Sequence, residues 1–287
     1  MHNLLRTLIY DGQVSLTLAD TTTLVERGAR LHGLSDTSAY LFGKALSAMT
    51  FMSACLKGEM GEISLFLKTS GVGGEIAVSG NRALNMRGYI ENVAVRCDMD
   101  EKGEREAFAK DGSITVIRND GYTRPFVGAC AFPEIGGLDK AFEEYFRISE
   151  QLPTRVVTTV ELDKKGKVLF AGVAVLQPLP FADETTLKKV DEVDLNALLT
   201  NVKTRGVEET VQAVFGKDER VWEVRTAKYQ CNCSRKYLTR VLVSLGEEQM
   251  RAIIREDGAV RIHCHYCNTD YEFTENDADE LFVKTKK

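Results

Sequence analysis

The decisive stretches of this sequence are Cys231-Asn232-Cys233 and Cys264-His265-Tyr266-Cys267, which hold four of its seven cysteines. A C-x-C pair is thus followed, after residues 234–263, by a C-x-x-C pair. Cysteine thiolates in two close pairs are the usual ligands of tetrahedral structural zinc. The spacing therefore predicts one zinc ion per chain, held by Cys231, Cys233, Cys264 and Cys267.

The segment around these pairs, residues 229–287, is predicted to be a small C-terminal zinc-binding domain. A domain of this size buries little apolar surface, and structural zinc can supply about 10–16 kcal/mol of apparent binding free energy to its folding. Four thiolates leave no open coordination position, so zinc-assisted hydrolysis is not expected. The flanking His263 and His265 are expected to lie outside the ligand set.

Local patterns predict how this small domain is built. The elements that we expect are helices over Ser234–Leu245 and Glu247–Glu256, strands over Ala259–Cys264 and Tyr271–Phe273, and a terminal helix from Asn276 or Asp277. Tyr237, Val241 and Leu245 fall on one face of the first helix. The C-x-x-C pair then lies at the tip of a hairpin. Nearby basic residues that could balance the charge of four thiolates are Lys228, Arg235, Lys236, Arg240 and Arg261.

Residues 179–228 are predicted to be a helical linker, because Pro178 and Pro180 end the preceding strand. Asp183 is a suitable cap for one helix that ends at Gly206, and a second helix is expected over Val207–Phe215. The apolar positions of the first helix are Leu187, Val190, Leu195, Leu198, Leu199 and Val202. Such a stripe must pack on another element. The segment is either an ordinary connector or a conditionally folded linker.

Residues 1–178 are predicted to form a larger N-terminal domain of the α+β class, because strand and helix runs do not alternate regularly. The strands that we expect are a hairpin over Leu5–Ala19, then Glu62–Lys68, Glu75–Val78, Leu84–Ile90, Ser113–Arg118, Arg155–Leu162 and Lys167–Leu176. The helices that we expect are Thr22–His32, a helix capped by Asp36 that ends near Leu56, and Leu138–Ile148.

Composition excludes several classes of protein. Hydrophobic residues make up 44% and charged residues 28% of the chain, and the net charge of −5 disfavours nucleic acid as a partner. No stretch predicts a membrane span, and Arg6 and Asp11 interrupt any signal-peptide core, so we expect a cytoplasmic protein with reduced thiols. Cys55, Cys97 and Cys130 are most simply small buried residues.

An enzyme is not predicted either. The turn Gly71-Val72-Gly73-Gly74 is the nearest approach to a phosphate-binding loop, but it lacks the following G-K-[ST] and is expected to be a β-turn. No nucleophile and base stand out in the sequence.

The C-x-C pair gives the predicted zinc site a possible second role. Two cysteines one residue apart can join only in a small strained ring, and strained disulfides are the labile, regulatory ones. Zinc-bound thiolates are also the form that peroxide attacks. Oxidation would remove ligands and the folding energy that they supply. A redox switch is therefore the favoured interpretation, and a purely structural zinc domain and a zinc-ribbon nucleic-acid module are the alternatives.

The same residues resemble the 33-kDa heat shock protein family of redox-regulated holdase chaperones. The likeness spans essentially the whole chain. The motifs that carry it are Cys231-Asn232-Cys233-Ser234-Arg235, Leu245-Gly246, the C-x-x-C-x-x-x-Y run Cys264–Tyr271, Ser149-Glu150-Gln151-Leu152-Pro153-Thr154, Gln177-Pro178-Leu179-Pro180 and Arg87-Gly88-Tyr89.

This resemblance implies a function that the residues alone do not supply. The zinc-bound reduced form is then inactive, and oxidants form the disulfides Cys231–Cys233 and Cys264–Cys267 and expel zinc. The C-terminal domain and the linker unfold, apolar surface is uncovered, and the protein tends to form a homodimer. It then holds unfolding client proteins against aggregation without ATP.

Overall fold

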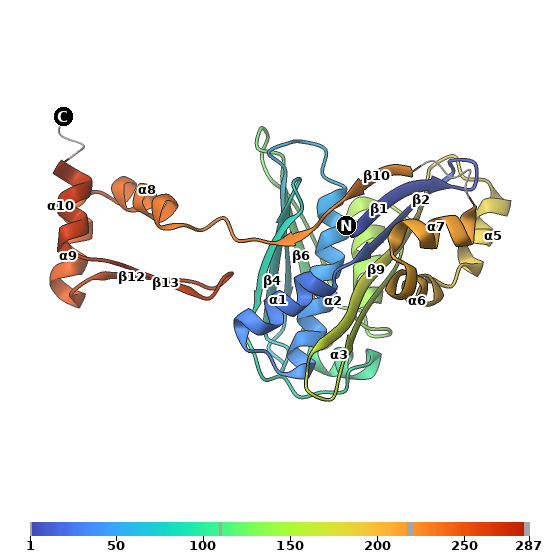
Figure 1. Ribbon diagram of the computed structural model, residues 1–287, viewed down its shortest axis with the longest axis horizontal. Helices are drawn as coiled ribbons and strands as arrows, with labels where there is room; N and C mark the ends of the chain where they lie inside the picture. Colours follow the sequence, from blue (N-terminus) through green and yellow to red (C-terminus); the bar gives the residue numbers. More distant parts are fainter. Residues whose placement is uncertain (1, 109–110, 217–220, 284–287) are drawn as a thin grey trace. The chain divides into compact units, whose positions relative to one another are not determined.

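The computed structural model describes residues 2–108, 111–216 and 221–283, and it divides into two compact units, residues 1–230 and residues 231–287. Figure 1 shows the course of the chain through both units. The boundary falls between Gln230 and Cys231, next to the first cysteine of the C-x-C pair. The segment 179–228 lies within the first unit. Its conditional folding stays a prediction.

The first unit contains a five-stranded antiparallel sheet in the order β10-β1-β2-β9-β8. Its strands are β1 (Leu4–Ile9), β2 (Val14–Asp20), β8 (Arg155–Leu162), β9 (Val168–Pro178) and β10 (Val221–Arg225). Both predicted hairpins of this sheet, β1–β2 and β8–β9, are confirmed. The first hairpin turns through Tyr10, Asp11 and Gly12, all with positive φ.

A six-stranded sheet in the order β11-β5-β4-β3-β6-β7 forms the other layer. Its strands are β3 (Glu62–Lys68), β4 (Glu75–Asn81), β5 (Asn85–Ile90), β6 (Ser113–Asn119), β7 (Phe126–Ala131) and β11 (Lys228–Tyr229). The sequence did not predict β7, β10 or β11. Strand β7 contains Gly128 and two alanines, which have low β-propensity. Strands β10 and β11 exist because they pair with the edges of sheets built from residues far away in the chain.

Helix α2 (Asp36–Ala54) is buried between strands of both sheets (Figure 1). Every residue from Ser38 to Ala54 is buried, which is why apolar residues occur on all sides of this helix rather than on one face. Its cap is Ser35 and not Asp36 as predicted, since the Ser35 hydroxyl accepts a hydrogen bond from the Ser38 N–H. Helix α1 (Thr22–His32), which the sequence predicted with these bounds, packs against it.

The outer face of the five-stranded sheet is covered by α5 (Glu184–Glu192), α6 (Leu195–Arg205) and α7 (Val207–Phe215). The sequence predicted one helix up to Gly206, which is wrong. The chain becomes extended at Val193, and Asp194 caps a new helix by accepting hydrogen bonds from two backbone N–H groups. The apolar stripe of α6 does pack on a sheet, because its buried leucines share a core with alternate residues of β1, β2 and β9.

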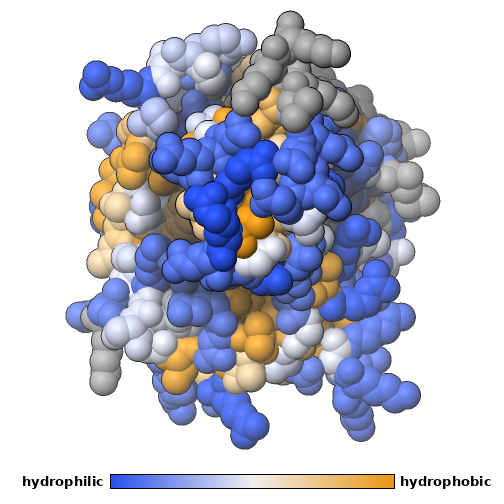
Figure 2. All heavy atoms as spheres, turned by 90° about the vertical axis from the view of Figure 1, so that its left-hand side faces the viewer, coloured by the Kyte–Doolittle hydropathy of each residue, from blue (hydrophilic) through white to orange (hydrophobic). Residues whose placement is uncertain are grey.

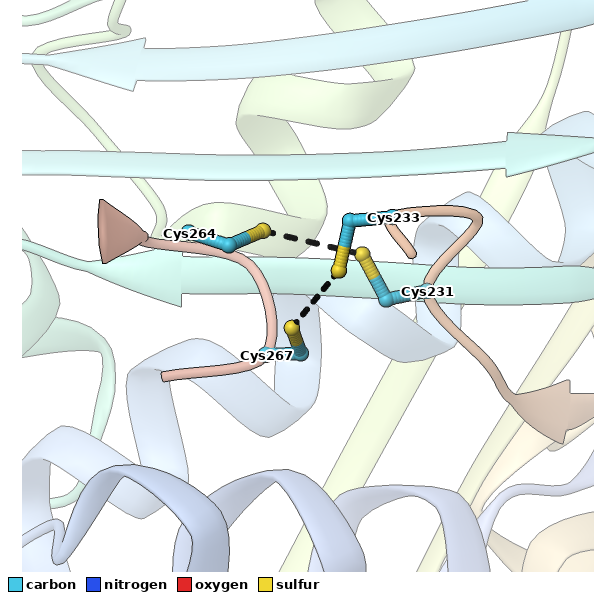
Figure 3. A group of neighbouring side chains, drawn as sticks. All are labelled: Cys231, Cys233, Cys264 and Cys267. Carbon is cyan, nitrogen blue, oxygen red and sulfur yellow. Dashed lines mark hydrogen bonds between the residues drawn. The ribbon is translucent and has the colours of Figure 1, made fainter. Parts of the chain in front are cut away.

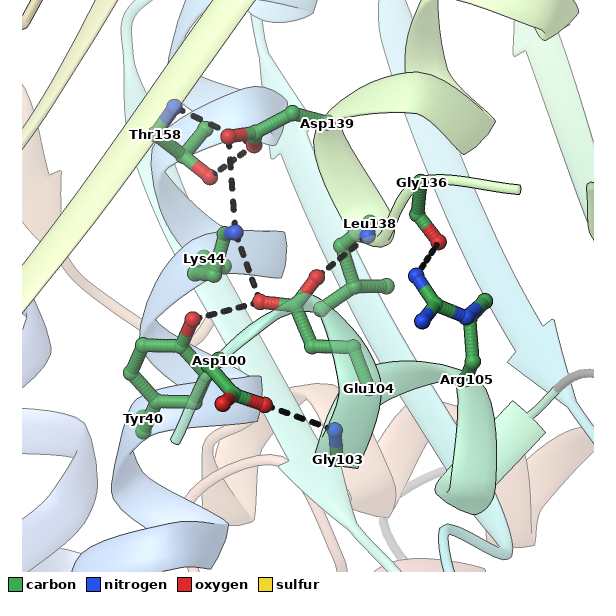
Figure 4. Close-up of polar contacts among 10 residues, drawn as sticks. All are labelled: Tyr40, Lys44, Asp100, Gly103, Glu104, Arg105, Gly136, Leu138, Asp139 and Thr158. Carbon is green, nitrogen blue, oxygen red and sulfur yellow. Dashed lines mark hydrogen bonds and ion pairs between the residues drawn. The ribbon is translucent and has the colours of Figure 1, made fainter. Parts of the chain in front are cut away.

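A buried polar network ties helices α3 (Glu101–Phe108) and α4 (Leu138–Tyr145) to α2 (Figure 4). One carboxylate oxygen of Glu104 accepts hydrogen bonds from Tyr40 at 2.5 Å and Lys44 at 2.7 Å, and the other accepts from the Leu138 N–H. Lys44 also lies 3.4 Å from Asp139. Burial alone lowers the pKa of Lys44, but the two carboxylates outweigh it and raise the pKa above its ordinary value. Lys44 therefore stays charged.

Helix α4 is shorter than its predicted span Leu138–Ile148, because a π-helical turn, η1 (Phe146–Glu150), follows it. Helix α3 was not predicted. Its sequence contains Gly103, and its formation depends on the burial of Glu104, Ala107 and Phe108. At its start, the Asp100 carboxylate accepts a hydrogen bond from the Gly103 N–H at 2.9 Å (Figure 4).

The second unit contains α8 (Arg235–Leu245), α9 (Glu247–Asp257), the hairpin of β12 (Val260–Cys264) and β13 (Thr269–Phe273), and α10 (Glu275–Val283). These elements confirm the predicted order. The predicted apolar face of α8 is nevertheless exposed: Tyr237, Val241 and Leu245 are 50%, 45% and 41% accessible. Helix α8 reaches the core through Leu242 instead, supported by Leu238.

The surface is largely polar. Figure 2 shows one face on which hydrophilic side chains predominate and hydrophobic ones form smaller areas between them. In the part of the chain that the structure describes, no helix combines the length and the apolar character needed to cross a bilayer.

Candidate metal centre

The four paired cysteines come from two segments of the second unit. Cys231 and Cys233 precede helix α8, whose first turn is capped by the hydroxyl of Ser234, which accepts a hydrogen bond from the Tyr237 N–H at 3.1 Å. Cys264 ends strand β12, and Cys267 lies in the turn before β13. The C-x-x-C pair is thus at the tip of a hairpin, as the sequence predicted.

The turn itself brings the second pair of sulfurs together. The Cys267 N–H donates a hydrogen bond to the Cys264 carbonyl at 3.3 Å, and Asn268 then takes a left-handed conformation with φ of 50°. Asparagine tolerates this conformation better than most residues do. The chain can therefore reverse within a few residues and leave both side chains on the same side of the hairpin.

The four sulfur atoms all lie within 4.8 Å of one another (Figure 3). The sulfurs of Cys231 and Cys264 are 3.8 Å apart, and those of Cys233 and Cys267 are 3.0 Å apart. A zinc ion with bonds of about 2.3 Å to four thiolates places neighbouring sulfurs about 3.8 Å apart. The donor set and its spacing therefore fit a metal ion that prefers tetrahedral thiolate ligands.

Hydrogen bonding within the cluster favours a thiolate at Cys233. Burial raises the pKa of this thiol, but hydrogen bonds from Cys267 and from the Tyr271 hydroxyl, 3.3 Å away, outweigh burial and lower the pKa below its ordinary value. Burial and the bond to Cys233 raise the pKa of Cys267 to about 11. Cys233 is therefore the sulfur that loses its proton most readily when a cation binds.

The two neighbouring histidines lie outside this group of sulfurs. The Nδ1 atom of His263 is 2.7 Å from Asp270, on the facing strand, and the ring of His265 packs edge-on to that of His263. Among the described residues, the cluster able to hold a metal consists of the four cysteines.

Two of the basic residues considered for balancing the negative charge of the thiolates form contacts with other groups of the second unit. Arg235 donates to the Glu272 carbonyl and to Asp277, and its guanidinium stacks 4.3 Å from the centre of the Phe273 ring. Arg261 pairs with Glu272 at 3.0 Å. Arg235 therefore links α8 to β13 and α10, and Arg261 links the two strands of the hairpin.

The core of the second unit is small. Its buried members are Leu242, Met250, Ile254, Val260, Phe273, Ala278 and Phe282. A core of this size leaves a domain of 57 residues only marginally stable. A cross-link through four sulfurs would therefore carry a large share of its stability.

Removal of the Ser234 side-chain hydroxyl tests whether this cap stabilises the start of helix α8. We expect Ser234→Ala to lower the free energy of unfolding of the zinc-loaded second unit by about 1 kcal/mol, because an N–H at the start of α8 loses its acceptor. Urea unfolding followed by NMR of the second unit measures this change. Ser244→Ala, on the same helix, is the matched control, since its hydroxyl bonds a carbonyl and caps nothing. Equal effects of both changes would contradict the capping role.

The three other cysteines lie apart from the cluster, in the first unit, and are half-buried rather than fully buried as predicted. Burial raises the pKa of Cys97 and of Cys130 to about 11. Both thiols are therefore protonated at neutral pH and poor nucleophiles.

The turn Gly71-Val72-Gly73-Gly74 joins β3 to β4. It is a β-turn, as predicted, closed by a hydrogen bond from the Gly74 N–H to the Gly71 carbonyl.

Comparison with known proteins gives a consistent result. The family model described as "Hsp33 protein" matches residues 2–274. Relatives named 33 kDa chaperonin include one from Clostridium perfringens, 31% identical over 99% of this chain and 91% of its own length, and one from Bacillus cereus, 32% identical over 97% of each. The crystal structure of a 33 kDa chaperonin from Thermotoga maritima has the same fold, with a TM-score of 0.82 and 23% identity over 100% of this chain and 99% of that one.

Proposed function

The chain belongs to the Hsp33 family of molecular chaperones, which are not enzymes, and we propose that it is a redox-regulated holdase that works without ATP. The observation that carries this proposal is the group of four thiols within 4.8 Å in a unit with a small core. A chemical change at these sulfurs would alter the folding of the whole unit.

In the reduced state, Cys231, Cys233, Cys264 and Cys267 would hold one zinc ion as thiolates. The ion would supply a cross-link between the start of α8 and the tip of the β12–β13 hairpin. The thiolates also keep the site closed to water, because four ligands complete the tetrahedron. This is the inactive form in our proposal.

Peroxide would convert the four thiols into two disulfides. Each disulfide forms when two thiolates give up two electrons, which together with two protons from solvent reduce one hydrogen peroxide to two water molecules. We propose the pairs Cys231–Cys233 and Cys264–Cys267, each of which joins neighbours in sequence. The shortest sulfur contact is the one between Cys233 and Cys267, so peptide mapping by mass spectrometry of the oxidised protein is needed to establish the pairing.

Sulfurs joined in disulfides are no longer thiolate ligands, so the second unit would lose zinc and unfold. We propose that residues 179–228 then unfold as well. Helices α5, α6 and α7 cover one face of the five-stranded sheet, and their departure would expose its buried residues, Leu5, Leu16, Leu18, Ala174 and Leu176. This apolar face would bind unfolding client proteins and favour a homodimer.

We also propose that the protein is cytoplasmic and that neither nucleic acid nor a membrane is among its partners.

A peroxide titration of the reduced, zinc-loaded protein at mildly raised temperature tests this proposal. We expect about one zinc ion to be released per chain, and only the oxidised protein to suppress light scattering from a heat-denatured client. A variant with Cys55, Cys97 and Cys130 replaced by serine is the control and should respond in the same way. If zinc leaves without any effect on client aggregation, the site is structural. If zinc stays bound after oxidation, the proposed redox switch is wrong.

A further inference from the structure

Residues 221–230, which we call the strap, complete both sheets of the first unit at once. Strand β10 is the edge of the five-stranded sheet and runs antiparallel to β1, with Leu4 opposite Arg225 and Leu5 opposite Val224. Strand β11 is the edge of the six-stranded sheet and runs parallel to β5, with Lys228 beside Asn85. The strap therefore covers two sheet edges whose backbone groups would otherwise lack a neighbouring strand.

The strap is held by ion pairs of Glu223 with Arg82 at 3.2 Å and Arg6 at 3.9 Å, and by its backbone. The Lys228 N–H donates to the Leu84 carbonyl at 2.9 Å, and the Gln230 N–H donates to the Met86 carbonyl at 2.7 Å. Between the two strands, the side-chain amide of Asn3 donates to the Ala227 carbonyl at 3.2 Å and accepts from its N–H at 2.8 Å. Backbone contacts of this kind do not depend on the sequence of the bound segment.

One side chain of the strap does enter a socket. Tyr229 is 8% exposed, and its hydroxyl donates to the Gly88 carbonyl at 2.8 Å and lies 3.1 Å from Nε2 of His32. The ring passes over Gly28 in the middle of α1, where a Cβ atom would lie 3.0 Å from the ring and 2.7 Å from Phe42. A glycine inside a helix costs stability, so its place here reflects the space that an aromatic ring needs.

We propose that these two edges and the Tyr229 socket form a second client-binding site, in addition to the apolar sheet face, and that it binds an extended segment of an unfolding client after the strap leaves. This inference rests on the proposed function. Gln230 is the last residue of the strap and directly precedes Cys231. The strap is therefore the part of the first unit that unfolding of the second unit disturbs first. Exposed sheet edges pair readily with other chains. Unfolding proteins expose extended segments of many different sequences, some of which contain aromatic residues. The socket adds a preference for an aromatic side chain.

A synthetic peptide with the sequence of residues 221–230 and a fluorescent label tests this site on the full-length protein. We expect the peptide to bind the oxidised protein and not the reduced one, in which the strap occupies the edges. Methylation of the peptide nitrogens at Lys228 and Gln230 removes the donors to the Leu84 and Met86 carbonyls and should weaken binding at least about tenfold. Methylation at Tyr229 is the matched control, because alternate N–H groups of a strand point to opposite sides.

The same peptide should also compete with the client. We expect excess unmodified peptide to reduce the suppression of client aggregation by oxidised protein, and a peptide with Tyr229→Ala to do so less well. If oxidised protein suppresses aggregation but binds the peptide weakly, or binds the doubly methylated form equally well, this inference is wrong and the proposed function stands. If the peptide only converts oxidised dimers to monomers without affecting client aggregation, the edges bind a second copy. If oxidised protein never suppresses aggregation, the proposed function fails.

Discussion

Replacement of Cys267 by serine is expected to abolish zinc binding and to unfold the second unit even under reducing conditions. A serine hydroxyl is a poor zinc ligand, and structural zinc can contribute about 10–16 kcal/mol to the folding of a small domain. Among the residues of this unit that the structure describes, seven hydrophobic ones form the buried core that would remain. Zinc content and the dispersion of NMR signals from residues 231–287 measure the result. If the proposed function holds, this variant also suppresses client aggregation without peroxide.

The matched control for this experiment is Cys97→Ser in the first unit. Cys97 is half-buried, as Cys267 is, but it lies outside the group of four sulfurs. We expect this variant to bind zinc normally and to keep both units folded. A Cys267→Ser protein that lacks zinc and still shows a folded second unit would contradict the claim that the four thiols hold this unit together.

Replacement of Glu104 by alanine is expected to destabilise the first unit by about 3–5 kcal/mol, the usual cost of removing one partner from a buried ion pair. Glu104 is fully buried and accepts hydrogen bonds from Tyr40, Lys44 and the Leu138 N–H. Its removal leaves the Lys44 ammonium with Asp139 alone, at the longer distance of 3.4 Å. Urea unfolding of the first unit, followed by circular dichroism, measures the change in the free energy of unfolding.

Glu106→Ala on the same helix is the control for Glu104. The side chain of Glu106 is 55% exposed and pairs only loosely with Lys102, at 3.7 Å, so we expect a loss below about 0.5 kcal/mol. A double variant, Lys44→Met with Glu104→Leu, should recover part of the lost stability because it removes the buried ammonium, while Asp139 keeps its two hydrogen bonds from Thr158. A loss below about 1 kcal/mol for Glu104→Ala would show that the network contributes little to folding.

The sequence identified the elements that are formed by local patterns. Hairpins β1–β2 and β8–β9 have alternating apolar residues and turn residues of their own, and the structure has both. The four cysteines were also recognisable, because ligand type and spacing can be read without knowledge of the fold. The break before Asp194 was missed because an apolar stripe continues across it at helical spacing. The exposed face of α8 was misjudged for a similar reason: periodicity locates a face but does not show what covers it.

The sequence by itself determined the α+β class, the two pairs of thiols and the prediction that they form one site. Only the tertiary structure decided which distant segments meet. Strands β10 and β11 have no strong pattern of their own and form because the edges of β1 and β5 offer them backbone partners. The contact of Lys44 with Glu104 likewise joins residues whose burial no local pattern reveals. Local propensity acts over a few residues, whereas sheet edges and buried charges find their partners only after the chain has folded.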